Sequence, residues 1–204
     1  MPDKQIEIAA EMLNGVFIWD YKKGDNIIYN LNILWSLYQA RYQARIKATH
    51  KELFNKPIML IIVSIIECIL DDFIERVQKR SRDPLPNLMQ SQITNLKYKR
   101  IGGNYRIKKL KKFNHYITQI QRQEIFGPRT SIYDALDLLR DIRNRIHIQN
   151  NKNILDADEF KVFTNKNLKI TEKVFRHIIK TMIIKFPRKR LERFKLDDFP
   201  FPFS

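Results

Sequence analysis

The side chains best suited to chemistry in this sequence lie together in the segment LLRDIRNRIHIQN, residues 138–150. Over residues 131–148 apolar side chains recur at helical spacing, which predicts a helix with one buried face. On a helical wheel Arg143 falls inside the apolar sector and His147 falls at its edge. Arg140 and Asn144 lie beside His147. A polar cluster therefore occupies positions where the helix should contact its neighbours.

A guanidinium on an inward face needs a partner, because burying an unpaired charge is costly. Glu67 is the leading candidate, since it interrupts the most apolar helix of the chain. In a structural interpretation, Arg143 pairs with Glu67 and His147 merely packs. In a chemical interpretation, arginine stabilises a phosphorane oxyanion and histidine transfers a proton. Such a pair could cleave RNA without a metal, with the ribose 2′-hydroxyl as the nucleophile.

The elements that must position this cluster are mostly helices separated by a few breakers. The most apolar one, residues 59–77, is expected at the centre. The other expected helices cover residues 27–46, 106–123, 131–148 and 168–186. An earlier helical stretch is expected to end near a turn at residues 22–25, and residues 81–105 are expected to be irregular apart from a short helix within residues 88–98. The predicted fold is all-α, an up-and-down bundle with an irregular basic insert.

The chain is divided by these patterns into three parts: an N-terminal arm or short helix (residues 1–24), a helical domain (25–186) and a basic, aromatic tail (187–204). Four phenylalanines in the tail could dock on this chain or on a partner: Phe194, Phe199, Phe201 and Phe203. The acidic residues Asp71, Asp72 and Glu75 are interpreted as a solvated helix end.

The composition points to a polyanionic partner. The 204 residues include 38 lysines and arginines against 22 aspartates and glutamates, a net charge of +16. Five glycines leave little material for a nucleotide-binding loop, and one cysteine excludes an intrachain disulfide. The first twenty residues lack the pattern of a secretion signal, and the apolar run 58–66 is too short for a bilayer span of about 20 residues. We therefore expect a cytoplasmic protein without a membrane segment.

The positive charge is densest between Asp83 and Glu124, where the sequence has no carboxylate. The candidate RNA-binding residues there are Lys97, Lys99, Arg100, Arg106, Lys108, Lys109, Lys111 and Lys112. Four aromatic residues are interleaved with them and could stack on unpaired bases: Tyr98, Tyr105, Phe113 and Tyr116. In the alternative interpretation the charges form a solvated helix face and the aromatic rings belong to the core.

Arg140, followed by six residues and then His147, resembles the R-x(4–6)-H signature of HEPN domains. The order of elements over residues 25–186 is also similar to a HEPN bundle: an apolar helix interrupted by an acid, a basic region, the LRDIRNRIHI helix and a final amphipathic helix. The resemblance implies an all-helical, metal-independent endoribonuclease that works as a homodimer in toxin–antitoxin or antiviral systems. It further implies a composite cleft built from Arg140, Arg143, Asn144 and His147 of both chains.

The sequence departs from the RNxxxH form of the family, which would need a histidine in place of Ile148. Either Arg140 is the signature arginine with Arg143 assisting, or catalysis is altered or lost. The leading expectation is an endoribonuclease for single-stranded RNA, with an antitoxin or regulatory protein as a further partner. The alternatives are a non-catalytic RNA-binding module and an adaptor whose Arg/His cluster is a dimer interface. No cofactor or metal is expected, since His50, His115 and His177 lack metal-ligand spacing.

Overall fold

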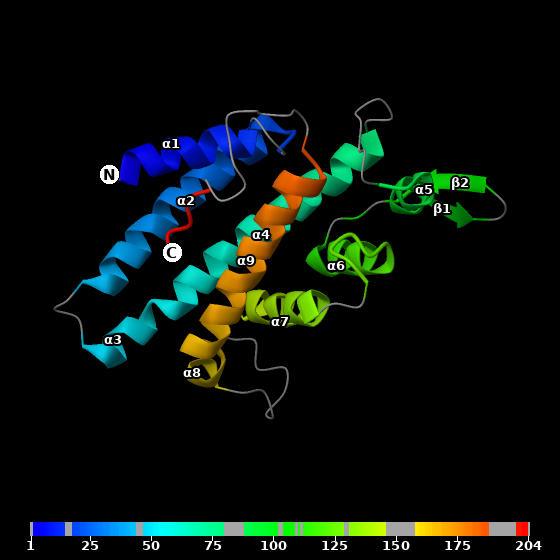
Figure 1. Ribbon diagram of the computed structural model, residues 1–204. Helices are drawn as coiled ribbons and strands as arrows, with labels where there is room; N and C mark the ends of the chain where they lie inside the picture. Colours follow the sequence, from blue (N-terminus) through cyan, green and yellow to red (C-terminus); the bar gives the residue numbers. More distant parts are fainter. Residues whose placement is uncertain are drawn as a thin grey trace.

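The structure is a computed structural model that describes residues 2–14, 18–43, 47–79, 88–101, 104–108, 110, 112–128, 131–145, 158–187 and 199–203. Most of these residues lie in helices (Figure 1). The helices are α1 (Pro2–Met12), α2 (Tyr21–Tyr42), α3 (Ala48–Leu53), α4 (Asn55–Lys79), α5 (Gln90–Lys97), α6 (Phe113–Arg122), α7 (Ser131–Asn144), α8 (Glu159–Val162) and α9 (Asn165–Lys185). The strands are β1 (Tyr98–Ile101) and β2 (Asn104–Ile107). The all-α prediction is confirmed.

Helix α4 lies at the centre of the bundle and contacts α2, α5, α6, α7 and α9. Its first half is apolar on almost every side, so residues such as Ile58, Ile62 and Ile66 are fully buried. Helices α1 and α2 lie on one side of α4 and α9, and α6 and α7 lie on the other (Figure 1). The central helix expected over residues 59–77 is therefore confirmed, with longer bounds. None of the described helices is long and apolar enough to cross a bilayer.

The second helix starts earlier in the chain than the sequence predicts. Helix α2 begins at Tyr21 and runs through the expected turn at residues 22–25. Its N-cap is Asp20, whose side chain accepts the Lys23 backbone N–H at 3.2 Å. Gly24 serves close packing instead of a turn, since a Cβ there would lie 1.9 Å from Asn14 Oδ1. Because Met12 and Leu13 are fully buried, the N-terminal segment is part of the core.

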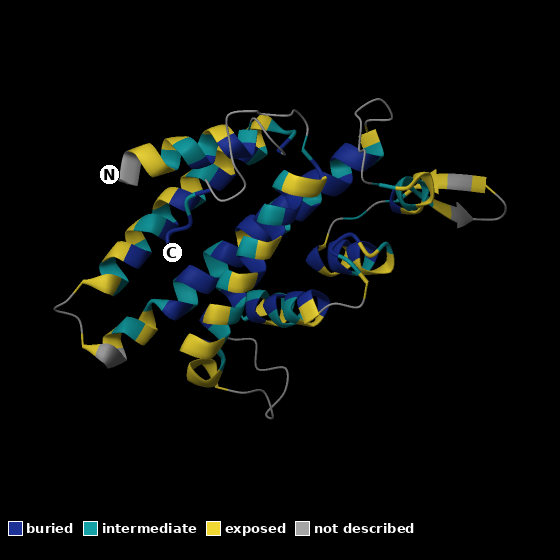
Figure 2. Ribbon diagram, in the orientation of Figure 1, coloured by how far each residue is buried: buried dark blue, intermediate teal, exposed yellow. Residues whose placement is uncertain are grey.

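The insert is also more ordered than expected. Helix α5 leads into an antiparallel hairpin in which Tyr98 pairs with Ile107 and Lys99 with Arg106. The prediction of a helix starting at Arg106 is wrong, because Arg106 lies in β2 and α6 begins only at Phe113. Backbone pairing across the hairpin replaces the helical hydrogen bonds that were expected there. The hairpin extends away from the bundle and its described residues are mostly exposed (Figures 1 and 2).

The end of the tail packs on the bundle. Phe199 and Phe201 are buried, and Phe201 meets Phe175 edge to face with centroids 5.8 Å apart. The Arg176 guanidinium lies 4.4 Å from the centroid of the Phe201 ring. The ring of Phe203 lies 5.7 Å from that of Tyr38 in α2. This segment therefore joins α2 to α9, whereas Phe194 lies outside the described residues.

Candidate functional site

Arg143 and Glu67 form an ion pair that joins α7 to α4. Arg143 Nε lies 3.0 Å from Glu67 Oε2, and the two side chains are 42% and 20% exposed. The pairing expected from the sequence is therefore present. Arg143 holds this place because α7 buries Ile132, Leu136 and Leu139, which leaves the arginine at the last turn of the same face.

The Arg143 guanidinium has N–H donors that its contact with Glu67 does not use. Arginine carries five N–H donors, and the contact with Glu67 is made through Nε. Among the described residues, no hydrogen bond from its two Nη groups is found. A half-exposed guanidinium fixed along one edge and open along the other is suited to holding a phosphate oxygen.

Arg140 has a different environment, although it lies only one turn away. Its Nη1 donates to Asp137 Oδ1 at 2.8 Å and to Asn114 Oδ1 at 3.1 Å. Its Nε and Nη2 both donate to Asp141 Oδ1, at 3.2 and 3.1 Å. Two carboxylates therefore offset the charge of Arg140, and Asn114 ties it to α6. Of the two arginines, Arg143 is the better placed to meet an incoming anion.

The other two candidate residues, Asn144 and His147, come from the C-terminal end of α7 and the segment after it. Asn144 is the last residue of α7 and is exposed. His147 lies outside the described residues, as does the rest of the helix expected to continue to Ile148.

An acidic face of α4 runs on from Glu67. Glu67, Asp71 and Glu75 are four residues apart and lie on one side of the helix. Lys23 Nζ lies 2.6 Å from Asp71 Oδ2 and 2.5 Å from Glu75 Oε2, and Lys79 also pairs with Glu75. The Tyr116 hydroxyl donates to Asp71 Oδ1 at 2.6 Å. These contacts connect α4 to α2 and α6.

The interpretation of Asp71, Asp72 and Glu75 as a solvated helix end is wrong, and Asp72 shows this most clearly. It is 1% exposed and accepts the backbone N–H groups of Trp19 and Asp20, each at 3.0 Å. Those two groups precede α2 and would otherwise be unsatisfied at its start. Asp72 thus fixes the beginning of α2 against α4.

The pKa values of this face indicate a structural network. Burial lowers the pKa of Lys23, but the hydrogen bonds and charges of Asp71 and Glu75 outweigh it and raise the pKa above the ordinary value. For Glu75, burial acts to raise the pKa, and the contacts with Lys23 and Lys79 bring it below the ordinary value. Burial and the hydrogen bond to Asp71 raise the pKa of Tyr116. Lys23, Glu75 and Tyr116 therefore hold their protonation states at neutral pH and are poor proton-transfer groups.

The basic insert has exposed and internal cations. Lys99 and Arg106 are exposed and face each other across the hairpin, and Lys112 is exposed at the start of α6. Lys97 is half-buried, with its Nζ 5.3 Å from the centroid of the Tyr98 ring. Three further candidates are not described at the side-chain level: Arg100, Lys109 and Lys111.

Lys108 is internal. Its Nζ donates to Gln119 Oε1 at 2.5 Å and to the backbone oxygen of Asn95. Burial and the nearby charge of Arg122 lower the pKa of Lys108. Because Lys108 joins α5 to α6, it is a structural residue and a weak candidate for phosphate contact.

The aromatic residues of the insert correct the expectation of base stacking. Phe113 is 3% exposed and Tyr116 is 5% exposed, so neither ring can stack on a base. The amphipathic spacing of α6 places both in the core. Tyr98 is half-buried, and the Tyr105 side chain is not described. Of the four rings, Phe113 and Tyr116 are therefore unavailable for stacking on bases.

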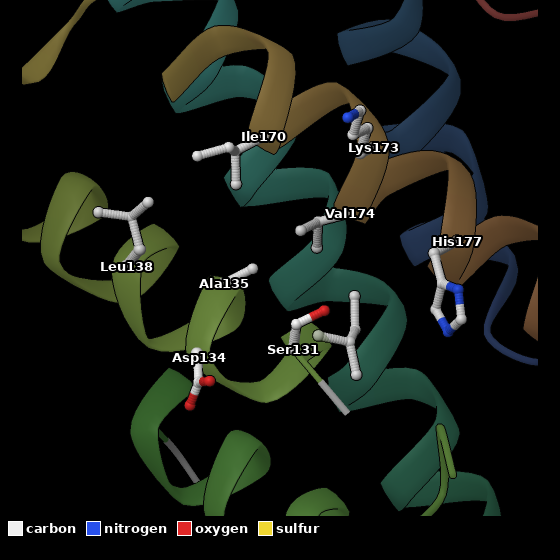
Figure 3. Close-up of a pocket in the computed structure, with 9 residues that line it drawn as sticks. Ser131, Asp134, Ala135, Leu138, Ile170, Lys173, Val174 and His177 are labelled. Carbon is white, nitrogen blue, oxygen red and sulfur yellow. The ribbon is translucent and has the colours of Figure 1, made fainter. Parts of the chain in front are cut away.

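Sequence reasoning missed a groove of about 560 Å³ between α7 and α9 (Figure 3). Its apolar walls come from Ala135 and Leu138 on α7 and from Ile170 and Val174 on α9, and His177 lies at one edge. Only the pairing of two helices far apart in the chain creates it, so local spacing gives no signal. Among the described residues, no group of three or more His, Cys, Asp or Glu side chains could hold a metal ion.

Comparisons with known proteins found no matching family model, no matching curated protein and no matching solved structure.

Proposed function

We propose that this protein is an endoribonuclease that binds single-stranded RNA through its basic insert and cleaves it at the C-terminal end of α7. The observation that carries the proposal is the Arg143 guanidinium, held by Glu67 through Nε, with its Nη groups open among the described residues. An arginine fixed in this way is preorganised to stabilise the charge that develops on a phosphate in the transition state.

The proposed reaction uses the RNA's own nucleophile. His147 removes the proton of the ribose 2′-hydroxyl, and the 2′-oxygen attacks the adjacent phosphorus. Arg143 binds the non-bridging oxygens, while Arg140 and Asn144 position the backbone beside it. The bond to the 5′-oxygen breaks as a second histidine, His147 of another copy, donates a proton. The products are a 2′,3′-cyclic phosphate and a 5′-hydroxyl.

The resemblance of Arg140 and His147 to the HEPN signature supports this proposal, as does the bundle with an acid on its central helix. In the same proposal the protein acts in the cytoplasm as a homodimer, in a toxin or antiviral system, with an antitoxin or regulatory protein as a partner. Arg143 has the more open guanidinium, so we assign it the main phosphate contact and give Arg140 a positioning role.

The decisive assay incubates the purified protein with single-stranded RNA in excess EDTA and identifies the product ends. We expect 2′,3′-cyclic phosphate ends, and loss of cleavage in His147→Ala and Arg143→Ala with the fold retained by circular dichroism. Lys22→Ala is a charge-removing control, since Lys22 is exposed on α2, outside both the insert and α7. Arg140→Ala should retain more activity than Arg143→Ala. Strict Mg²⁺ dependence, 3′-hydroxyl ends or full activity of His147→Ala would contradict the mechanism.

A non-catalytic RNA-binding module is the second candidate. It is favoured by the exposed Lys99 and Arg106 in the hairpin together with the compensated charge of Arg140. Wild-type protein that binds RNA in a salt-dependent manner but leaves it intact would support this candidate over the nuclease.

A further inference from the structure

The groove between α7 and α9 lies on the edge of α7 away from Arg140 and the neighbouring helix α6. Ile170 and Val174 of α9 face Leu138 and Ala135 of α7 across it (Figure 3). Ile132 also lines the groove and is 9% exposed. Each wall of the groove is a ridge of side chains three or four residues apart, formed by Ala135 and Leu138 on α7 and by Ile170 and Val174 on α9. The space between two such ridges has the form that receives a third helix.

The groove continues along α9. A second hollow of about 490 Å³ shares Ile170 and Lys173 with the first and is lined further by Asn165, Lys166 and Lys169. From Lys166 to His177 the α9 edge is about 17 Å long, or three helical turns. An apolar trough of this length matches the apolar stripe of a short amphipathic helix.

The two sides of the trough carry opposite charges. Lys166, Lys169 and Lys173 are all exposed along α9. On the α7 side, Asp134 is exposed and lines the groove. Among the described residues, no ion pair joins these three lysines to a carboxylate. The basic side is the longer one, so it dominates the field that an approaching partner would meet.

We propose that this trough binds an amphipathic helix of a partner protein, with an apolar stripe in the groove and acidic residues along the flank that lies against α9. A single helix fits because it is convex and the trough is concave. A second copy of this chain would present the same concave surface, and two such surfaces would leave a channel between them. A nucleic acid would meet the lysines but has no apolar stripe to cover Leu138 and Ile170.

The test uses the full chain and three synthetic helical peptides, with binding followed by fluorescence anisotropy. The first peptide carries leucines at positions i, i+4, i+7 and i+11, glutamates on one flank and lysines on the other. The second has the same leucines with lysines on both flanks, and the third is a scrambled sequence with the composition of the first. We expect the first peptide to bind at least about tenfold more tightly than either of the others, because only it satisfies both the apolar and the charged contacts.

Variants locate the contact. Leu138→Glu and Ile170→Glu should each weaken binding of the first peptide by about tenfold, since a charge then lies in the apolar stripe. The exposed double change Lys169→Glu/Lys173→Glu should reverse the preference, so that the second peptide binds better. Lys4→Glu/Lys22→Glu changes the net charge equally at exposed positions on α1 and α2 and should leave the preference as it is.

Three results would overturn the proposal. The first is equal binding of the scrambled peptide, which would mean non-specific attraction to a basic protein. The second is an unchanged preference in Lys169→Glu/Lys173→Glu. The third is a dimer in sedimentation that Leu138→Glu dissociates and the first peptide does not, which would assign the face to a second copy.

Discussion

Two cations of the bundle lie beside carboxylates: Lys23 contacts Asp71 and Glu75, and Arg143 contacts Glu67. In the insert, no carboxylate occurs between Asp83 and Glu124, and the cations Lys99 and Arg106 face each other on an exposed hairpin. Side chains of the same type therefore have different roles. Lys23 and Arg143 connect helices of the bundle, whereas we propose that the charges of Lys99 and Arg106 serve an anionic partner.

The largest expected effect is on the stability of the bundle. Asp72→Ala removes the acceptor of two backbone N–H groups and should lower the free energy of unfolding by about 2–4 kcal/mol. Urea denaturation at neutral pH measures the change. The matched insert variants Lys99→Met and Arg106→Met should each stay within about 0.5 kcal/mol of wild type. Insert variants as destabilising as Asp72→Ala would break the distinction between the two regions.

The second expected effect is on RNA affinity. Lys99→Gln/Arg106→Gln should weaken binding of single-stranded RNA by about tenfold and make the log–log salt dependence shallower by about 0.7 for each phosphate that the variant no longer neutralises. The control Lys56→Gln/Lys161→Gln removes the same charge from lysines that pair with Glu159 and Asp158. It should change affinity by about twofold. Equal decreases in affinity in both double variants would show that only the overall charge matters.

The smallest effect is the pH dependence of the α4 network. The pKa of Glu75 is lowered in the folded protein, so its ion pairs contribute fully above the unfolded pKa and are lost as the pH falls through the folded pKa. Relative to wild type, Glu75→Gln should lower the free energy of unfolding by about 0.5 kcal/mol at neutral pH and by progressively less in acid. Thermal unfolding of both proteins from neutral pH into acid measures this difference in stability. A constant difference at every pH would contradict the ion-pair account.

The Arg143–Glu67 pair could be predicted because it violates a local pattern. A charged residue inside an apolar helical sector must find a partner, and one acid interrupted the most apolar helix. The inward face of α7 and the central place of α4 follow from the same periodicity.

The hairpin and the Asp72 contacts could not be read in the same way. Strands of four residues have too few positions for alternation to stand apart from helical spacing, although the Gly-Gly pair at residues 102–103 is typical of hairpins. Asp72 accepts from residues more than 50 positions earlier, so no local pattern separates it from an exposed acid. The α7/α9 groove likewise depends on tertiary packing.

The central claim is that binding and cleavage are divided between the insert and α7. It is tested most directly by measuring, in EDTA, both the RNA dissociation constant and the single-turnover cleavage rate of Arg143→Ala and Lys99→Gln/Arg106→Gln. The account predicts that Arg143→Ala reduces the cleavage rate by about a thousandfold with little change in affinity. The insert variant should bind more weakly and cleave normally at saturating protein. The claim is contradicted if Arg143→Ala cleaves at the wild-type rate, or if the insert variant fails to cleave at saturation.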